Sequence, residues 1–168
     1  MSHAIRLEGG ALRFSAAHFT TFGGECEPLH GHNYAVTVEI VGDLTSDAWV
    51  MDFSEAKRIV ASVCKELDHK FILQSDSGAL TIDTGVEVEV NFGPRRYVMP
   101  VGDVAALPID NSTAERLAEW LSGRLVEELR AAGASNLESI LVGVEEAPGQ
   151  SGWFRLALSE RTGARRES

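Results

Sequence analysis

Cysteine is scarce in this sequence, since Cys26 and Cys64 are the only two among 168 residues. Two cysteines provide no disulfide framework of the kind that holds small secreted domains together. Positive charge is also in deficit, with 15 Lys and Arg against 25 Asp and Glu and a formal net charge of −10. This balance argues against a nucleic-acid partner or a polybasic membrane anchor, because both bind through a cationic surface.

Long apolar runs are missing as well. No uncharged stretch approaches the roughly 20 apolar residues that a membrane span requires. The first ten residues contain no apolar core of signal-peptide length. The composition is otherwise that of an ordinary globular protein, with 44% apolar and 24% charged residues. We therefore expect one cytoplasmic domain over residues 1–168, long enough to bury one sizeable core.

The hydrophobic pattern changes its period several times along the chain. Residues 34–40 alternate strictly between apolar and polar or small side chains, which is typical of a half-buried strand. Helical spacing of apolar residues appears twice, with a second stretch of alternation between the two helices. The predicted elements are strands over 12–19, 33–40, 138–146 and 152–158, helices over 53–67 and between 112 and 133, and an inserted hairpin over 79–99.

Both predicted helices have start signals. Asp52 or Ser54 can cap the first helix. Ser112-Thr-Ala-Glu115 is a capping-box pattern, in which the serine accepts from an early amide and the glutamate reaches back, and Gly133 ends this helix. The polar residues 160–168 predict a frayed tail. The order of strands, helix, insert, helix and strands indicates an α+β fold.

Three of the five histidines lie within 15 residues of one another, namely His18, His30 and His32. In a strand, His30 and His32 point to the same face, and His18 joins them if it ends a neighbouring antiparallel strand. Three neutral imidazoles with one open position form a catalytic zinc site, although nickel, copper and iron also accept imidazole. A lone His-x-His is more often a surface pair, but the third histidine and the nearby Cys26 favour metal binding.

The sequence leaves several roles open for Cys26. It lies four residues before His30 in a glycine-flanked loop, where it can be a fourth ligand of a structural site, a nucleophile or a base. Cys64 falls on the apolar side of the first helix and reads as an inert core residue. Asp68 and His69 follow that helix directly, and on their own they indicate a histidine that balances the helix dipole.

Several of these residues belong to ordered motifs that resemble a known family. The pattern is similar to that of the 6-pyruvoyl-tetrahydropterin synthase and 6-carboxytetrahydropterin synthase family over residues from about 12 to 158. A single His-Gly-His would be weak evidence, whereas five motifs in the family's order are specific. These are Cys26-Glu-Pro-Leu-His-Gly-His-Asn-Tyr34 with the preceding Phe14-Ser-Ala-Ala-His18, Met51-Asp-Phe53, Leu67-Asp-His69, Asn111-Ser-Thr-Ala-Glu115 and Val144-Glu-Glu-Ala-Pro148.

The resemblance implies a fold and an assembly. The family has the tunnelling fold, an antiparallel four-stranded sheet with two helices on one face. Its subunits join edge to edge into a barrel, as a trimer or a hexamer, which also covers the exposed sheet edges. The active sites of the family lie at subunit contacts. We therefore expect a homo-oligomer in which each pocket is shared between neighbouring chains.

The resemblance also assigns roles to individual residues. It implies that the three clustered histidines bind Zn²⁺, that Cys26 is the catalytic thiol, and that Asp68 and His69 complete a proton-transfer set. Glu146 matches the glutamate that grips the pterin, a task that suits a carboxylate because it accepts two parallel N–H bonds. The adjacent Glu145 fits the family's Glu-Thr dipeptide less well. Two further residues, Thr113 and Glu115, match a segment that helps to hold the pterin.

Two features depart from the family's minimal pattern. The segment over about 74–107 is an insert, which is expected to reshape the pocket rim or an oligomer contact. Glu27 follows Cys26 directly, whereas one branch of the family uses the cysteine and another uses a glutamate at this place. The chain therefore resembles a dual type, with Glu27 either a second base or a solvated loop carboxylate.

The implied substrate is the small molecule 7,8-dihydroneopterin triphosphate. Triphosphate elimination leads to 6-carboxy-5,6,7,8-tetrahydropterin, a queuosine and deazapurine precursor, or to 6-pyruvoyl-tetrahydropterin. Retro-aldol cleavage leads instead to 6-hydroxymethyl-7,8-dihydropterin for folate synthesis. The rival hypothesis is a non-catalytic, zinc-stabilised binding module, in which Cys26 and the three histidines close a structural tetrahedron. That module would give no role to Asp68, His69 or Glu146.

Overall fold

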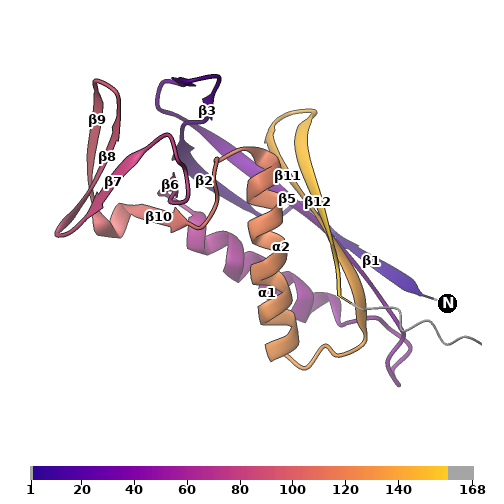
Figure 1. Ribbon diagram of the computed structural model, residues 1–168. Coiled ribbons are helices and arrows are strands. Elements are labelled where there is room, and N and C mark those ends of the chain that lie inside the picture. Colours follow the sequence, from indigo (N-terminus) through magenta and orange to yellow (C-terminus); the bar gives the residue numbers. More distant parts are fainter. Residues whose placement is uncertain (1, 159–168) are drawn as a thin grey trace, which may run out of the picture.

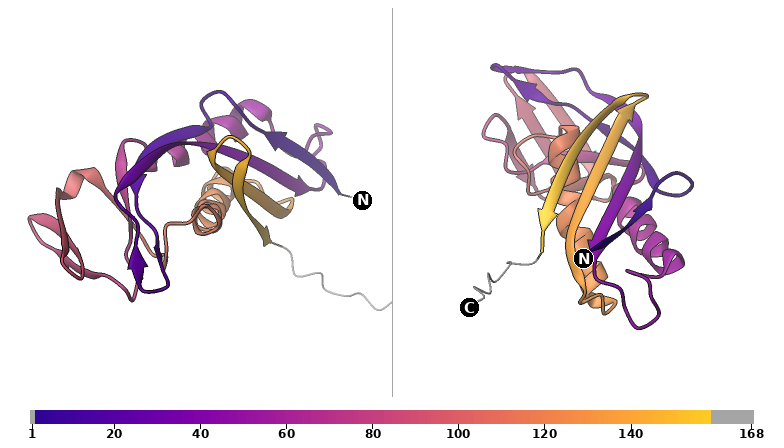
Figure 2. Two further views of the ribbon diagram at one scale, coloured as in Figure 1. Left: turned by 90° about the horizontal axis from the view of Figure 1, so that it is seen from above. Right: turned by 90° about the vertical axis from the view of Figure 1, so that its right-hand side faces the viewer.

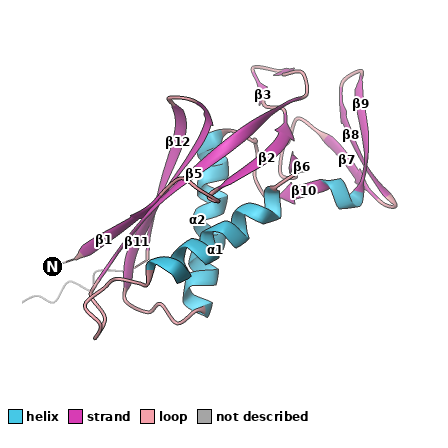
Figure 3. Cartoon of the chain, turned by 180° about the vertical axis from the view of Figure 1, so that it is seen from behind, coloured by secondary structure: helices cyan, strands magenta, loops and turns pink. Residues whose placement is uncertain are grey.

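The computed structural model of the protein describes residues 2–158 (Figure 1). The predicted frayed tail over 160–168 lies outside the described residues. The chain forms a curved sheet with two helices, α1 (Phe53–Leu67) and α2 (Ala114–Ala131), on the same face (Figure 3). Figure 2 shows α2 seated in the curve of the sheet. Neither helix is long and apolar enough to cross a membrane.

The predicted four-stranded antiparallel core is present. It consists of β2 (Arg13–His18), β5 (His30–Gly42), β11 (Leu137–Ala147) and β12 (Gln150–Ala157), paired in that order. Three strands that the sequence analysis missed extend it: β1 (His3–Leu7) pairs with β5, while β6 (Lys70–Gln74) runs parallel to both β2 and β10 (Val104–Leu107). The sheet is therefore mixed at one end. Strand β6 is buried along nearly its whole length and shows no alternation that would reveal it.

The helix starts were partly predicted. Asp52 caps α1, because its carboxylate accepts from the amides of Ser54 and Glu55 at 2.9 Å each. The capping box at Ser112 was wrong, since Thr113 caps α2 and accepts from an amide at 3.4 Å. The Ser112 hydroxyl instead donates to the carbonyl of Phe19 at 2.8 Å, which ties the start of α2 to the end of β2.

The two ends of α2 depend on glycines. Gly133 has φ +90° and follows the last turn, as predicted, because this left-handed conformation costs glycine little. Gly152 of β12 lies so close to the start of α2 that a Cβ there would sit 2.4 Å from the amide nitrogen of Glu115. The glycine therefore lets the start of α2 rest against the sheet. That contact brings the beginning of α2 to the region where the histidines lie.

The insert is a small sheet with one more strand than the predicted hairpin. Strands β8 (Glu87–Phe92) and β9 (Arg95–Pro100) form that hairpin, and β7 (Thr81–Thr84) pairs with the other edge of β8. A 3₁₀ turn over Val101–Asp103 leads on to β10. The insert packs beside the hairpin of β3 (Thr21–Phe22) and β4 (Glu25–Cys26). Residues of the insert and of this hairpin belong to one apolar cluster. Its buried members are Phe19, Cys26, Phe71, Leu73, Val88 and Val90.

Candidate active site

Three histidines meet on one face of the β2–β5 pair. His18 is the register partner of His30, and His32 lies two residues further along β5 on the same face. The ring centroids are 4.6 Å apart for His18 and His30, 5.2 Å for His18 and His32, and 5.0 Å for His30 and His32. One nitrogen from each ring lies within 4.8 Å of the other two. Period-two alternation on paired strands is what brings them together.

Backbone carbonyls orient two of these rings. The Nδ1 atom of His18 donates to the carbonyl of Ser112 at 2.9 Å, and that of His30 donates to the carbonyl of Pro28 at 2.8 Å. A carbonyl only accepts, so each Nδ1 carries the hydrogen and each Nε2 presents a lone pair. Burial lowers the pKa of His18 to about 4, which keeps that ring neutral at pH 7. Its buried Nε2 has no hydrogen-bond partner among residues 2–158.

The three imidazoles fit a divalent metal ion such as zinc. Two of the rings are held by backbone carbonyls, and the buried, unpaired Nε2 of His18 is the atom that a metal would take. The closed tetrahedron with Cys26 as fourth ligand does not occur in the described part of the chain, because the clustered donors there are the three histidines alone. The arrangement leaves a ligand position open.

A cavity of about 630 Å³ opens beside the histidines. Its size is in the usual range for small-molecule sites. It lies where β2, β5, the start of α2 and the β11–β12 turn come together. Besides the three histidines, its walls include Thr20, Glu27, Thr113, Glu115, Glu146 and the turn residues Gly149 to Gly152.

Glu146 reaches into this cavity and Glu145 does not line it. The β11–β12 register shifts at this point, with Glu145 opposite Ser151 and Ala147 opposite Gln150, so Glu146 occupies a bulge. Glu146 Oε1 lies 4.0 Å from Nε2 of His18 and is buried without a partner among the described residues. Burial raises the pKa of this carboxyl group. The carboxylate of Glu145 instead accepts a hydrogen bond from the amide of Gly149 at 3.0 Å.

Glu27 and Cys26 face opposite sides of their loop. The Glu27 carboxylate lines the cavity, where its Oε2 accepts from the hydroxyl of Thr20 at 2.6 Å, and this hydrogen bond lowers the pKa of the carboxyl group. Cys26 packs into the apolar cluster with Phe19 and Phe71, and burial raises the pKa of its thiol. In this conformation the carboxylate, and not the thiol, lies beside the histidines. Sequence reasoning had no signal for Thr20 as its partner.

Asp68 and His69 form a dyad on the other face of the sheet. Nδ1 of His69 lies 2.9 Å from Oδ2 of Asp68, whose Oδ1 accepts from the amide of Ser15 at 2.8 Å. His69 has φ +58°, an unusual conformation for a residue with a side chain that often marks a functional position. The imidazole therefore bonds to Asp68 rather than merely to the end of α1. This differs from the simple helix-dipole interpretation.

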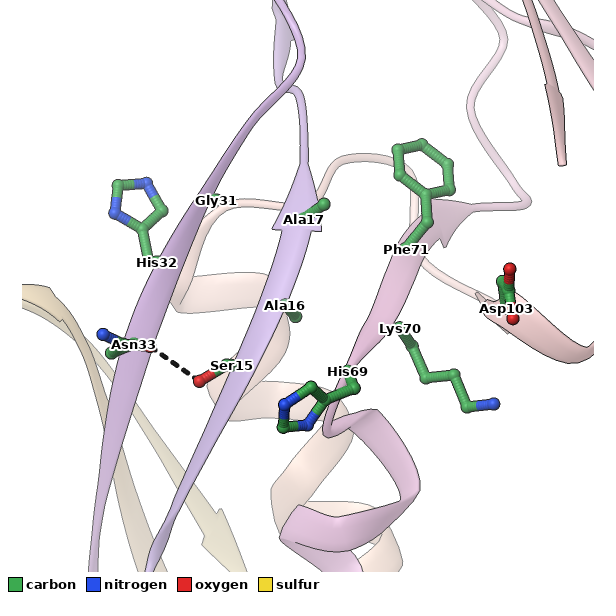
Figure 4. Close-up of a pocket in the computed structure, with 10 residues that line it drawn as sticks. All are labelled: Ser15, Ala16, Ala17, Gly31, His32, Asn33, His69, Lys70, Phe71 and Asp103. Atoms are coloured by element: carbon green, nitrogen blue, oxygen red, sulfur yellow. Dashed lines mark hydrogen bonds between the residues drawn. The ribbon is translucent and has the colours of Figure 1, made fainter.

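His69 of this dyad lines a second cavity, of about 530 Å³ (Figure 4). Ser15 and Asn33 line it and are hydrogen-bonded to each other at 2.6 Å, with His69 and Lys70 nearby. Ser15 and Asn33 alternate with the residues that carry the histidine cluster, so the two cavities open on opposite faces of β2 and β5. His32 lines both cavities, but within one chain His69 does not belong to the group of three clustered histidines.

Comparison with known proteins agrees with this architecture. The family model for 6-pyruvoyl tetrahydropterin synthase matches residues 10–156. A protein of Methanocaldococcus jannaschii, provisionally named 6-carboxy-5,6,7,8-tetrahydropterin synthase, is 36% identical over 158 residues, which are 92% of this chain and 97% of that one. A dihydroneopterin monophosphate aldolase of Pyrococcus furiosus is 42% identical over 116 residues, or 69% of this chain and 71% of that one.

A solved structure shows the same fold. The 6-pyruvoyltetrahydropterin synthase of Plasmodium vivax, as a catalytic residue mutant with glutamate changed to alanine, superposes with a TM-score of 0.88 at 30% identity. The match covers 94% of this chain and 99% of that one. The curved α+β fold with two helices is thus the fold of tetrahydropterin synthases. From its sequence match and its fold, the chain belongs to the 6-pyruvoyl tetrahydropterin synthase family of enzymes.

Proposed function

We propose that this protein is a zinc-dependent lyase that acts on 7,8-dihydroneopterin triphosphate. Its first expected product is 6-carboxy-5,6,7,8-tetrahydropterin or the related 6-pyruvoyl compound. The observation that carries this proposal is one cavity that holds both the Glu146 carboxylate, with one buried and unpaired oxygen, and three clustered imidazoles. The carboxylate suits the N–H edge of a pterin ring, and the imidazoles suit a metal beside the hydroxylated side chain of that ring.

His18 and His30 would hold the metal through Nε2, with His32 as the third ligand. Zinc bound there supplies a Lewis acid that polarises side-chain oxygens of the substrate. The chain's own contribution is preorganisation, because the carbonyls of Ser112 and Pro28 fix the ring hydrogens of His18 and His30 on the far side. These contacts hold two of the donor rings before any ligand arrives.

Glu146 would hold the pterin end of the substrate. Its Oε1 has no partner among residues 2–158, so two N–H donors of a pterin would satisfy the carboxylate directly. Thr113 and Glu115, at the start of α2, line the same cavity and would restrict how the ring lies. The 4.0 Å between Glu146 and His18 means that a ring bound here has its substituent next to the histidines.

A second outcome is favoured by the orientation of Glu27. This carboxylate lines the cavity with its pKa lowered by Thr20, so it is an ionised base beside the substrate side chain. Cys26 would need its loop to turn before it could take a proton. We assign to this base the retro-aldol cleavage to 6-hydroxymethyl-7,8-dihydropterin. The aldolase name of the Pyrococcus furiosus relative supports this second candidate, and the Plasmodium vivax 6-pyruvoyltetrahydropterin synthase supports a glutamate as catalytic residue in this fold.

The Asp68–His69 dyad would join the site of another subunit. It lies on the face of the sheet that is turned away from the histidine cavity, so one chain carries two half-sites. The outer strands β12 and β10 leave sheet edges to which further strands can be added. We therefore infer a homo-oligomer, a trimer or a hexamer, in which His69 of one chain serves the cavity of the next.

Product analysis by mass spectrometry tests the proposal. The zinc-loaded enzyme is given 7,8-dihydroneopterin triphosphate, and separately sepiapterin, and the pterin products are identified. We expect Cys26→Ala to lose the carboxy-tetrahydropterin route and Glu27→Ala to lose the hydroxymethyl route, with Cys64→Ala as a control thiol outside the cavity. No turnover by the wild-type protein would reject the proposed function. Unchanged yields in Glu27→Ala would make this glutamate a bystander.

A further inference from the structure

One arginine of the insert is bonded to the loop that carries both candidate bases. Nη1 of Arg95, at the start of β9, donates to the carbonyl of Cys26 at 2.6 Å and to the carbonyl of Glu27 at 2.8 Å. The insert thus reaches the candidate active site through a side chain, 68 residues beyond Glu27 in sequence. No ion pair of Arg95 occurs within the described residues. Besides the two carbonyls, its guanidinium lies beside the Cys26 thiol, where it lowers the pKa of that thiol against the larger, opposite effect of burial.

The geometry of this contact fixes the local backbone. Neighbouring carbonyls of an extended segment point in opposite directions. At Cys26 and Glu27 both carbonyls accept from one nitrogen, so the chain has to turn between them. The turn leaves the Cys26 side chain in the apolar cluster under the insert and the Glu27 side chain in the histidine cavity.

The hairpin that precedes this contact is short. It consists of two-residue strands, β3 and β4, joined through Gly23 and Gly24 at φ +58° and +81°. So short a hairpin is barely stable by itself. At Glu27 the other contacts go to Thr20, since the backbone amide of Glu27 donates to its carbonyl at 3.0 Å and the carboxylate accepts from its hydroxyl at 2.6 Å and its amide at 3.4 Å. The Cys26 thiol donates to the carbonyl of Glu27 at 3.3 Å, and Asn111 bonds to the amide and the carbonyl of Thr21. Among these contacts, Arg95 supplies the charged donor, and it is shared by both carbonyls of the loop.

We propose that Arg95 is a positioning residue that holds Glu27 in the cavity and keeps Cys26 out of it. It would thereby set which of the two bases meets the substrate. The effect on products rests on the proposed function, whereas the effect on the loop does not. The chemical consequence is that Arg95, outside the cavity walls, controls the balance between the two pterin products.

Thiol labelling of the folded protein measures the loop directly. Arg95→Ala, Arg95→Lys and Arg96→Ala are each treated with iodoacetamide, and the rate at Cys26 is followed by peptide mass spectrometry. We expect Arg95→Ala to label Cys26 roughly tenfold faster than wild type, because the loss of two charge-assisted hydrogen bonds exposes the thiol and outweighs the loss of a cation that lowers its pKa. Arg95→Lys keeps a cationic donor and should react close to wild type. Arg96 instead pairs with Glu89 at 2.7 Å on the insert, so Arg96→Ala is the matched control.

Cys64 reports on the rest of the fold in the same sample, since it is buried in α1. Faster labelling of Cys26 with slow Cys64 supports the proposal, and a wild-type Cys26 rate in Arg95→Ala overturns it. If Cys64 also becomes fast, Arg95→Gln, which keeps neutral donors and more of the side chain, is judged by the same two rates. The product ratio is measured next and should move toward the Cys26 route in Arg95→Ala. Because labelling needs no substrate, an inactive wild type would reject the proposed function without affecting this test.

Discussion

The two faces of the β2–β5 strand pair differ in how well their polar groups are satisfied. On the face toward α2, three buried polar atoms have no partner among residues 2–158: Nε2 of His18, the hydroxyl of Tyr34 and Oε1 of Glu146. On the opposite face, Ser15 bonds to Asn33 through its side chain and to Asp68 through its amide. An unsatisfied buried polar atom costs about 1–3 kcal/mol. The face toward α2, here called the inner face, therefore loses stability through these atoms. The opposite face, here called the outer face, does not.

This difference separates a binding surface from a supporting one. The inner face has donors and acceptors that only a ligand or metal would complete. The outer face uses its hydrogen bonds to hold Asp68 and, through it, the imidazole of His69. If the two faces work together, they do so across a subunit contact. Each prediction below alters one face and leaves the other intact.

The largest effect is expected from His32→Ala on the inner face. The chain is expected to bind about one zinc per subunit, and this variant should lose the metal and more than roughly a hundredfold in activity, since even outer contacts of a metal ligand contribute 10–100-fold. His3→Ala, in the exposed part of β1, is the control. Metal content by mass spectrometry and turnover are measured together. Full activity after exhaustive chelation would contradict the metal site.

Mixing two inactive variants would show whether the faces belong to one shared site. His69→Ala and His32→Ala are expected to be inactive separately. If a site takes its histidines from one chain and His69 from the next, dissociating and reassembling an equal mixture restores up to about a quarter of the sites. Turnover before and after reassembly is the measurement. A mixture that stays inactive, while wild type survives the same treatment, places both residues in the site of one chain.

Glu146→Ala should chiefly weaken pterin binding. The N–H donors of the bound ring would lose a desolvated charged acceptor, a loss of roughly 2–5 kcal/mol. Glu145→Ala is the neighbouring control, because Glu145 itself does not line the cavity and its carboxylate bonds to the amide of Gly149. Sepiapterin affinity is measured by calorimetry for both variants. Equal affinities for wild type and Glu146→Ala would show that another group holds the ring.

Local pattern accounts for the parts that sequence predicted well. Strand alternation gave the shared face of Phe14, Ala16 and His18, and these three side chains are buried. Helical spacing and the Asp52 cap gave α1. Residues fixed by non-local contacts were predicted less well. The Ser112 cap was wrong because the strand carbonyl of Phe19, 93 residues earlier, takes its hydroxyl.

The candidate site shows the same division. The three histidines follow from period-two alternation on paired strands, which is visible in sequence. The sequence offered Cys26 and Glu27 as adjacent candidate bases, but which of them enters the cavity was not predicted. The loop conformation that places Glu27 in the cavity is bonded to Arg95 of the insert and to Thr20, and neither contact is visible in the local sequence pattern. A prediction of the side of the sheet on which His69 lies also requires the parallel pairing of β6 with β2, which the sequence pattern did not show.

The smallest effect, from Tyr34→Phe, isolates the stability cost of the inner face. The ring of Tyr34 stacks on Phe14 at 4.7 Å, a contact that phenylalanine keeps, and the variant removes only the buried hydroxyl. If that hydroxyl has no partner in the free protein, its loss stabilises the fold by about 1 kcal/mol, or about 2–4 °C in the melting temperature. Tyr97→Phe in the insert, where the tyrosine is only half-buried, should change stability by less than about 0.5 kcal/mol. Thermal unfolding of metal-free protein is the measurement. A destabilised Tyr34→Phe would mean that the hydroxyl is already hydrogen-bonded in the free chain. The polar groups of the inner face would then be satisfied more nearly as well as those of the outer face.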